Sequence, residues 1–307
     1  MKLHIIKWER LWWSVSALFI LGGIIAMVIS YSTFNSPVRP GIDFIGGTRL
    51  QLQLACMAEG TCDQSIDTGK VREILVQQGL NGSIQVLEKN ILSIRSKNLD
   101  VDQRTQLQQI LNEKIGQFDP DTVQIDTVGP TVGQELFKSG ILALLVAFLG
   151  IIVYLTIRFQ FDYAFFAIIA LFHDVLITVG IFAVLGLITE IEVDSLSLVA
   201  LLTIIGFSVN DTVVIYDRIR DNIEKQPDIS INEVVEISVN QSLARSINTS
   251  VTTILPLLAI FLFGGETLKY FSLALIIGFV AGAYSSIFIA STLLAWWRNR
   301  TFSLVES

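Results

Sequence analysis

Charged residues are scarce in this 307-residue chain, where Asp, Glu, Lys and Arg make up 16% of all positions and apolar residues make up 52%. Soluble globular domains usually carry roughly 25% charged residues, so the deficit argues against an ordinary soluble enzyme and against a disordered chain. The net charge of −7 gives no reason to expect nucleic acid, which requires clustered Lys and Arg. With a mean hydropathy of +0.61, the class that remains is an integral membrane protein.

Catalytic and metal-binding motifs are missing as well. The sequence contains no GxxxxGK[ST] phosphate-binding loop, no HExxH, no Cys/His cluster and no Gly-x-Ser-x-Gly. Two cysteines are also too few for a disulfide-dense scaffold or a four-thiolate metal site. We therefore expect no enzyme, no metal and no other cofactor, and any work must be driven by an ion gradient or by a partner.

Long apolar stretches are present instead. A bilayer core is crossed by about 20 helical residues, and six stretches approach or exceed that length: 11–30, 139–157, 163–189, 195–216, 246–265 and 270–297. The sequence therefore predicts six transmembrane helices. The first is predicted to be a retained span, because it is too long for the apolar core of a signal peptide and no clean cleavage site follows it.

Lys and Arg near the ends of the spans predict their orientation, because cytoplasmic loops are enriched in these residues. One side of the membrane receives Lys2, Lys7, Arg10, Arg158, Arg218, Arg220, Lys225, Arg245, Arg298 and Arg300, whereas the short loops of the other side receive Lys269. Both termini are therefore predicted to be cytoplasmic. The predicted domains are the N-terminus with the first span at 1–31, an outward, periplasmic domain at 32–136, the other spans at 137–297 and a cytoplasmic tail at 298–307.

The segment between the first two spans has the pattern of a small α+β domain. Alternating apolar residues predict strands, a 3.6-residue period predicts helices, and Lys89-Asn90 marks a hairpin. The expected order is strand 48–55, helix 65–78, strands 83–88 and 91–96, helix 101–115 and strand 122–128. This β-α-β-β-α-β order is typical of a ferredoxin-like fold. The predicted fold class is an α-helical membrane protein of six transmembrane helices with a ferredoxin-like α+β domain inserted between spans one and two.

Cys56 and Cys62 both lie in the outward domain, six positions apart around a loop that contains Gly60. An oxidising compartment would allow them to form a disulfide that closes this loop. Two free thiols near a strand end are the alternative, and the sequence does not choose between the two states.

Ionisable residues inside the spans give the strongest functional signal. Asp211 lies about five residues, or roughly 7–8 Å, from the middle of the fourth span, where an acid costs about 2.5–3.5 kcal/mol. Arg245 enters the fifth span from the cytoplasmic end, at a depth that could approach Asp211. The polar residues expected to support this pair are Ser208, Asn210, Asn248, Thr249 and Thr252.

Two interpretations of Asp211 and Arg245 remain open at this stage. A guanidinium favours an ionised carboxylate while burial disfavours it, and these opposed effects could make Asp211 a proton relay. The alternative is a static pair that fixes helix packing. His173-Asp174, near the centre of the third span, adds a second titratable site at midplane depth, and its alternative is a hydrogen-bonded pair lining the bundle.

Small residues at intervals of four mark the sixth span, with Gly278, Gly282 and Ser286 on one stripe. Such a stripe allows two transmembrane helices to approach closely. We interpret it as helix packing rather than chemistry.

Several stretches resemble one known family. The sequence Gly41-Ile42-Asp43-Phe44-Ile45-Gly46-Gly47-Thr48 is similar to the Asp-Phe-x-Gly-Gly signature of the SecD/SecF family of bacterial preprotein translocase subunits. Further similar stretches are residues 206–220 around Asp211, residues 240–250 around Arg245, His173-Asp174, and Phe261-Leu262-Phe263-Gly264-Gly265. The resemblance covers essentially the whole chain.

The resemblance implies a member of the resistance-nodulation-division (RND) superfamily that pairs with a SecD-like subunit beside the SecYEG channel. It further implies SecA, a YidC-like insertase and a translocating preprotein as partners, and use of the proton motive force in late preprotein export. By this resemblance Asp211 and Arg245 match the family's proton-pathway acid and arginine, while Asp43, Phe44, Gly46 and Gly47 form a structural signature turn. The expected location is the bacterial inner membrane or an internal energy-transducing membrane.

Two other functions remain as alternatives. A small-molecule exporter of the same superfamily would need a larger outward domain with a substrate pocket, which one insert of about a hundred residues disfavours. A scaffold that only stabilises the translocon would use Asp211 as a static strut, and replacement of Asp211 by asparagine would then preserve function.

Overall fold

The computed structural model describes residues 3–58, 66–80, 82–87 and 91–305. The chain divides into two compact units, one formed by Met1–Arg39 with Gly140–Ser307 and the other by Pro40–Ser139. The first unit contains the membrane helices and the second contains a small sheet. Each is considered by itself.

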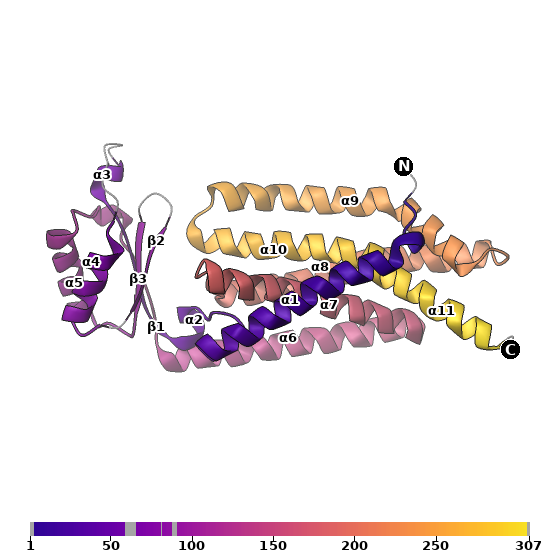
Figure 1. Cartoon of the computed structure of the whole chain (residues 1–307), viewed down its shortest axis with the longest axis horizontal. Coiled ribbons are helices and arrows are strands. Elements are labelled where there is room, and N and C mark those ends of the chain that lie inside the picture. Colours follow the sequence, from indigo (N-terminus) through magenta and orange to yellow (C-terminus); the bar gives the residue numbers. More distant parts are fainter. Residues whose placement is uncertain (1–2, 59–65, 81, 88–90, 306–307) are drawn as a thin grey trace. The chain divides into compact units, whose positions relative to one another are not determined.

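Six helices of the described residues are long and apolar enough to cross a membrane, which confirms the predicted number of spans. Their bounds are α1 Glu9–Phe34, α6 Pro130–Arg158, α7 Phe161–Ile188, α8 Ser195–Lys225 and α9 Ile231–Phe263, with the last span built from α10 Glu266–Ser285, the π-helical segment η4 Ser286–Ala290 and α11 Ser291–Val305 (Figure 1). A short 3-10 turn, η1 Ile6–Trp8, precedes α1. The chain is therefore a multi-pass membrane protein.

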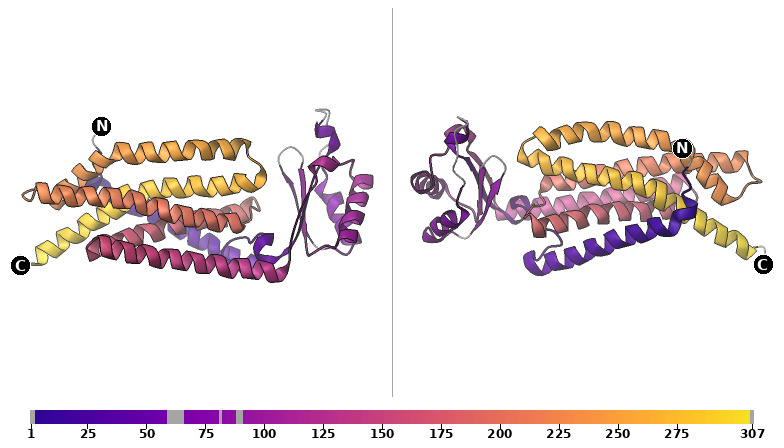
Figure 2. Two further views of the ribbon diagram at one scale, coloured as in Figure 1. Left: turned by 180° about the vertical axis from the view of Figure 1, so that it is seen from behind. Right: turned by 45° about the horizontal axis from the view of Figure 1, so that its top comes forward.

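The helices α8 and α9 run well beyond the apolar stretches that predicted them. Asp194 begins α8 with a capping box, and Ser230 caps α9 by accepting a hydrogen bond from the Glu233 amide at 3.3 Å. The extended ends stay helical because they bury their own apolar face, including Ile219, Val235 and Val239, in the main core of the unit. Figure 2 shows α9 running beside α10 in both further views.

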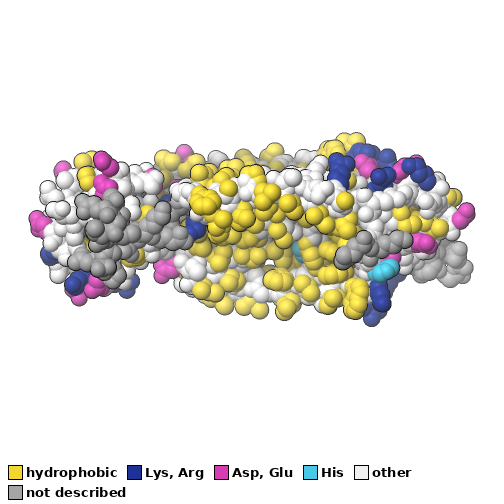
Figure 3. Space-filling model, turned by 90° about the horizontal axis from the view of Figure 1, so that it is seen from above, with side chains coloured by type: hydrophobic (Ala, Val, Ile, Leu, Met, Phe, Trp, Pro, Cys, Tyr) yellow, Lys and Arg dark blue, Asp and Glu magenta, His cyan; other side chains and the backbone are white. Residues whose placement is uncertain are grey.

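The surface of the membrane unit is apolar along its middle, with Lys and Arg gathered towards one end (Figure 3). On α9 the exposed apolar side chains are Ile247, Val251, Leu255, Leu258 and Leu262. Such an apolar band is the surface that the hydrocarbon core of a bilayer covers, because the core offers no hydrogen bonds to polar side chains.

Two glycines meet where α1 crosses α7. A Cβ atom added at Gly23 would lie 2.9 Å from the Cα atom of Gly180, and one added at Gly180 would lie 2.8 Å from the Cα atom of Gly23. The backbones of α1 and α7 therefore touch without intervening side chains, as small residues allow in membranes.

The second unit has the predicted ferredoxin-like topology. Its elements are α2 Ile42–Ile45, β1 Gly47–Gln53, α3 Ala55–Ala58, α4 Thr68–Gln77, β2 Gly82–Leu87, β3 Ile91–Ser96, α5 Val101–Lys114, η3 Pro120–Thr122 and β4 Gln124–Val128. The strands pair antiparallel in the order β2-β3-β1-β4, with Leu50 opposite Ile94 and Leu52 opposite Leu92. These four side chains are buried beneath α4 and α5, so the alternation that predicted the strands also builds the core.

Some predicted boundaries were wrong. The first strand ends at Gln53 rather than at residue 55, because Leu54 forms an isolated bridge with Phe118 and the chain then turns into α3. The last strand begins at Gln124, because the Asp119 side chain accepts from the Asp121 amide and starts a 3-10 turn. The short helices α2 and α3 were not predicted.

Cys56 lies in α3 and is disulfide-bonded. This excludes the alternative of a free thiol at Cys56. Cys62, the candidate partner, lies outside the described residues, as do Lys89 and Asn90 of the predicted hairpin.

Gly46 and Gly47 form a tight turn between α2 and β1. Their φ angles are +75° and +133°, and a Cβ atom added at Gly47 would lie 2.6 Å from the carbonyl oxygen of Ser96 on β3. Only glycine meets both requirements, positive φ and close backbone approach, without strain.

Replacing Gly47 by alanine is therefore expected to destabilise the sheet unit by about 2 kcal/mol. Limited proteolysis of the full chain in membranes would show faster cleavage between residues 40 and 139. Gly129→Ala is the matched control, because a Cβ atom at Gly129 has nothing within 4 Å. Equal protease resistance of the two variants would contradict this account.

Candidate functional site

Two acids lie inside the membrane bundle, Asp174 on α7 and Asp211 on α8. Asp174 is completely buried and Asp211 is 7% exposed. Because a buried carboxylate needs compensating donors, their hydrogen bonds determine what each can do.

Asp174 is fully supplied with donors. Its Oδ2 atom accepts from Ser208 on α8 and from Ser285 on α10, the latter at 2.8 Å, and its Oδ1 atom lies 2.9 Å from Nδ1 of His173. The carboxylate therefore ties three helices together.

His173 extends this network to the first span. Its Nε2 atom lies 3.0 Å from the Ser16 hydroxyl on α1, and Ser16 in turn donates to the Tyr284 hydroxyl at 3.3 Å. Tyr284 donates to the carbonyl of Trp12 at 2.9 Å, and its ring stacks on the imidazole. The network thus runs from α1 through α7 and α8 to the last span.

Only one of the two carboxylate oxygens of Asp211 has a hydrogen-bond donor among the described residues. Its Oδ1 atom accepts from the Ser246 hydroxyl on α9 at 2.8 Å. Its Oδ2 atom is buried and has no hydrogen-bond partner among the described residues. An acceptor left open in this way is suited to receive a proton.

The helix α8 brings the two acids into one polar seam. Ser208, Asp211 and Thr212 follow at i, i+3 and i+4, so they share a face of the helix. Ser208 contacts Asp174, while Thr212 hydrogen bonds to Ser286 of η4 at 2.7 Å. Both acids are therefore held by α8 against the last span.

Arg245 does not form the direct pair with Asp211 that the sequence suggested. In the described part of the chain, Asp211 is hydrogen bonded to Ser246, and no hydrogen bond or ion pair joins it to Arg245. The reason is helical phase, because Ser242, Ser246 and Ser250 are buried at intervals of four, whereas Arg245 lies on the exposed side.

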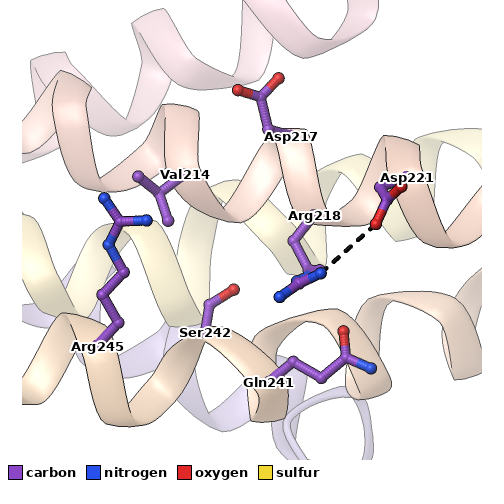
Figure 4. A pocket seen from close by; sticks show the side chains of 7 residues that line it. All are labelled: Val214, Asp217, Arg218, Asp221, Gln241, Ser242 and Arg245. Carbon is purple, nitrogen blue, oxygen red and sulfur yellow. Dashed lines mark hydrogen bonds and ion pairs between the residues drawn. The ribbon is translucent and has the colours of Figure 1, made fainter.

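The Arg245 side chain lines a pocket of about 350 Å³ between α8 and α9. Figure 4 shows it reaching towards Val214 of α8. The other lining residues are Asp217, Arg218, Asp221, Gln241 and Ser242.

The polar support predicted for Asp211 was assigned to the wrong residues. Ser208 contacts Asp174 instead, and Asn210 and Asn248 are exposed. Thr249 and Thr252 donate to carbonyls of their own helix, Arg245 and Asn248 respectively. The partner that was missed is Ser246, and its signal in the sequence was the serine repeat every four residues on α9.

The small-residue stripe of the last span faces α8. A Cβ atom added at Gly278 would lie 2.2 Å from Ile204, one added at Gly282 would lie 3.1 Å from Ser208, and Ser286 bonds Thr212. Close approach of α10 is thus what brings Ser285 within reach of Asp174. Among the described residues no group of three or more His, Cys, Asp or Glu side chains could hold a metal ion.

Comparison with known proteins gives these features a family context. Residues 107–300 match the family described as protein export membrane protein SecD/SecF, C-terminal, and residues 31–56, which contain Gly46 and Gly47, match the SecD/SecF GG motif. The protein translocase subunit SecF of Synechocystis is 63% identical over 300 residues, covering 97% of this chain and 95% of that one. SecF of Thermobaculum terrenum is 39% identical over 318 residues, covering 98% and 95%.

Solved structures share the fold. A crystal structure of SecDF, a translocon-associated membrane protein from Thermus, superposes with a TM-score of 0.81 at 30% identity. The match covers 97% of this chain and 39% of that chain, so the present chain spans about two fifths of its length. SecDF in a super-membrane-facing form gives a TM-score of 0.69 at 29% identity, covering 100% and 40%.

Proposed function

The chain belongs to the SecD/SecF family and has a SecF-like role in protein export, and we propose that it drives late preprotein translocation with the proton motive force. Asp211 carries this proposal, because it is a buried carboxylate in a membrane helix with one oxygen bonded to Ser246 and the other open. Charged groups at this depth are costly and are retained in ion pathways.

The proposed cycle uses the two states of Asp211. The ionised carboxylate holds α9 through Ser246 and attracts Arg245 at longer range. A proton from outside neutralises Asp211, removes that attraction and lets α8 and α9 shift, and release of the proton to the cytoplasm restores the first state. One charge crossing 100 mV is worth about 2.3 kcal/mol, which biases a two-state rearrangement roughly fifty-fold.

The exposed polar residues of α8 and α9 favour a partner protein that covers them within the membrane. Asn210, Arg245 and Asn248 are exposed at positions that belong to the spans. Lipid tails cannot satisfy such groups, so another polar helix must cover them. We assign this face to a SecD-like subunit.

The wider assembly follows from the family. We propose the SecYEG channel, SecA, a YidC-like insertase and the preprotein as further partners. The proposed location is the bacterial inner membrane, with both termini and the Arg245 end of the bundle cytoplasmic and the sheet unit outside, as the distribution of Lys and Arg supports.

Replacement of Asp211 by asparagine tests the proposal. In cells depleted of the native subunit, export of a preprotein is expected to fall to the level of depleted cells, because an asparagine side chain at this position cannot exchange protons. Asp211→Glu is the matched control that keeps an acid, and it should retain part of the activity. Membrane abundance and co-purification of the partner are measured in the same cells.

Normal export by Asp211→Asn at unchanged abundance would refute proton drive and favour the scaffold. A small-molecule exporter would instead change drug tolerance while preprotein export stays constant.

A further inference from the structure

The helix α6 is held in different ways at its two ends. At its start, Phe137 packs edge-on against Phe44 at 5.5 Å, and a Cβ atom at Gly133 would lie 2.9 Å from the Phe44 carbonyl oxygen. The first turns of α6 are therefore part of the sheet unit.

The remainder of α6 is loosely embedded. Only 6% of its apolar window is buried inside the chain, against 44% for α7 and for α8. Its contacts to the bundle core come from one stripe, Leu144, Phe148, Ile151 and Leu155. Apolar contacts lack direction, so this stripe alone does not fix the position of α6 along its neighbours.

One ion pair fixes the far end. Both Asp217 oxygens accept from Nη2 of Arg158, at 2.7 and 2.9 Å, and the guanidinium lies over the Phe159 ring. Among the described residues, Arg158 is the α6 side chain that hydrogen bonds to another membrane helix. The pair is about two-fifths exposed on each side, 38% for both residues, so solvent weakens it and a competing cation can replace Arg158.

Arg245 is placed to be that competitor. It lines the same pocket as Asp217. Figure 4 shows the Asp217 carboxylate turned away from both Arg218 and Arg245, so Arg245 can take it only when the Asp217 side chain turns into the pocket. The other pocket carboxylate, Asp221, is already paired with Lys225 at 2.7 Å and Arg218 at 3.4 Å. Arg245 forms no ion pair within the described part of the chain, so among the carboxylates of this chain Asp211 and Asp217 are the two that we consider as its partners.

We propose that the Arg158–Asp217 pair is a coupling contact that transmits the state of Asp211 to α6. While Asp211 is ionised, it attracts Arg245 and leaves Asp217 to Arg158. When Asp211 is neutral, Arg245 competes for Asp217, Arg158 is released and α6 can slide on its apolar stripe. Arg158 and Asp217 act as positioning residues, and this inference rests on the proposed function of Asp211.

Pulsed spin-label distances test the coupling directly. Labels at the exposed positions Ile157 of α6 and Glu224 of α8 are measured in the full chain, co-purified with its partner, with Cys56 and Cys62 replaced by serine. Asp211→Asn is expected to add a second, longer distance population, and Asp217→Asn is expected to give that population alone. Asp211→Asn combined with Arg245→Gln should return the wild-type distribution, because the competitor is gone.

The control pair is the exposed Phe161 of α7 with Thr301 of α11, because the Arg298–Asp162 ion pair (2.7 Å) joins these two helices at the same end of the bundle without Arg245. Its distances should not respond to Asp211→Asn. An unchanged Ile157–Glu224 distance in Asp211→Asn, or a double variant that behaves like Asp211→Asn, would overturn the coupling. Loss of export by Asp211→Asn with unchanged distances overturns the coupling alone, whereas normal export overturns the proposed function.

Exchanging the charges of Arg158 and Asp217 distinguishes a coupling contact from an ion pair that only supports the fold. Arg158→Asp with Asp217→Arg rebuilds an ion pair and should restore abundance relative to Asp217→Asn. Export should remain several-fold below wild type, because an arginine at the Asp217 position repels Arg245 and the competition is abolished. Full recovery of export would show that the Arg158–Asp217 pair only supports the fold.

Discussion

Replacing Asp174 by alanine is expected to destabilise the membrane bundle by about 3 kcal/mol. The change leaves the hydroxyls of Ser208 and Ser285 without their acceptor, removes the Nδ1 partner of His173 and opens a cavity in a fully buried position. Buried donors without acceptors cost about 1–3 kcal/mol each, although serine can recover part of this by bonding its own helix, as Ser285 already does with Gly282. A lowered thermal midpoint in detergent and lower membrane abundance measure the effect.

Asp174→Asn is the matched variant, because it keeps the size and one acceptor oxygen for the two serines. We expect it to cost about 1 kcal/mol and to remain in the membrane. Its export activity then decides the role of Asp174, since an asparagine can support helices but cannot carry a proton. Normal export by Asp174→Asn assigns Asp174 to packing, whereas lost export at normal abundance makes it a second member of the relay. A stable Asp174→Ala variant would contradict the account of the network.

Replacing Gly23 by leucine is expected to separate α1 from α7 and to remove the chain from the membrane fraction. Even a Cβ atom there would lie 2.9 Å from the backbone of Gly180, and backbone cannot move aside as a flexible side chain can. Overpacking typically costs about 1–3 kcal/mol and more where backbones touch. The separation also draws Ser16 away from His173, so the buried network loses its link to α1.

The neighbouring glycine provides the control for this prediction. A Cβ atom at Gly22 has nothing within 4 Å, and the residue is exposed, so Gly22→Leu should be tolerated with abundance near wild type. Both variants add the same apolar side chain to the same span. Equal abundance of the two would show that the α1–α7 crossing does not depend on close backbone contact.

The sequence predicts elements better than it predicts contacts. The six spans and the ferredoxin-like fold of the sheet unit are confirmed, because long apolar runs and alternating residues report burial directly. The site was only partly predictable. Asp211 was visible as an acid in an apolar stretch, whereas its partner depends on which side of α9 faces α8.

Polarity alone could not identify that partner. Asn248, Thr249 and Thr252 are as polar as Ser246, yet they lie on other sides of α9 or bond their own helix. The buried serine repeat would have indicated the contact face, because small hydroxyl residues at intervals of four let helices approach. The network of Ser16, Tyr284 and Ser285 joins distant parts of the chain, and no local pattern contains it.

The π-helical segment Ser286–Ala290 changes the direction in which the later side chains of the last span project from the helix axis. At its start, the adjacent residues Ser285 and Ser286 contact different helices, Asp174 on α7 and Thr212 on α8, and at its end the Ala290 carbonyl accepts from Tyr216 at 3.1 Å. A wider turn there rotates everything that follows relative to a uniform 3.6-residue period. A helical wheel drawn with one period through residues 267–301 therefore assigns residues after Ala290 to the wrong faces. The face on which Thr292 contacts Trp13 is found only from a separate wheel that begins after Ala290.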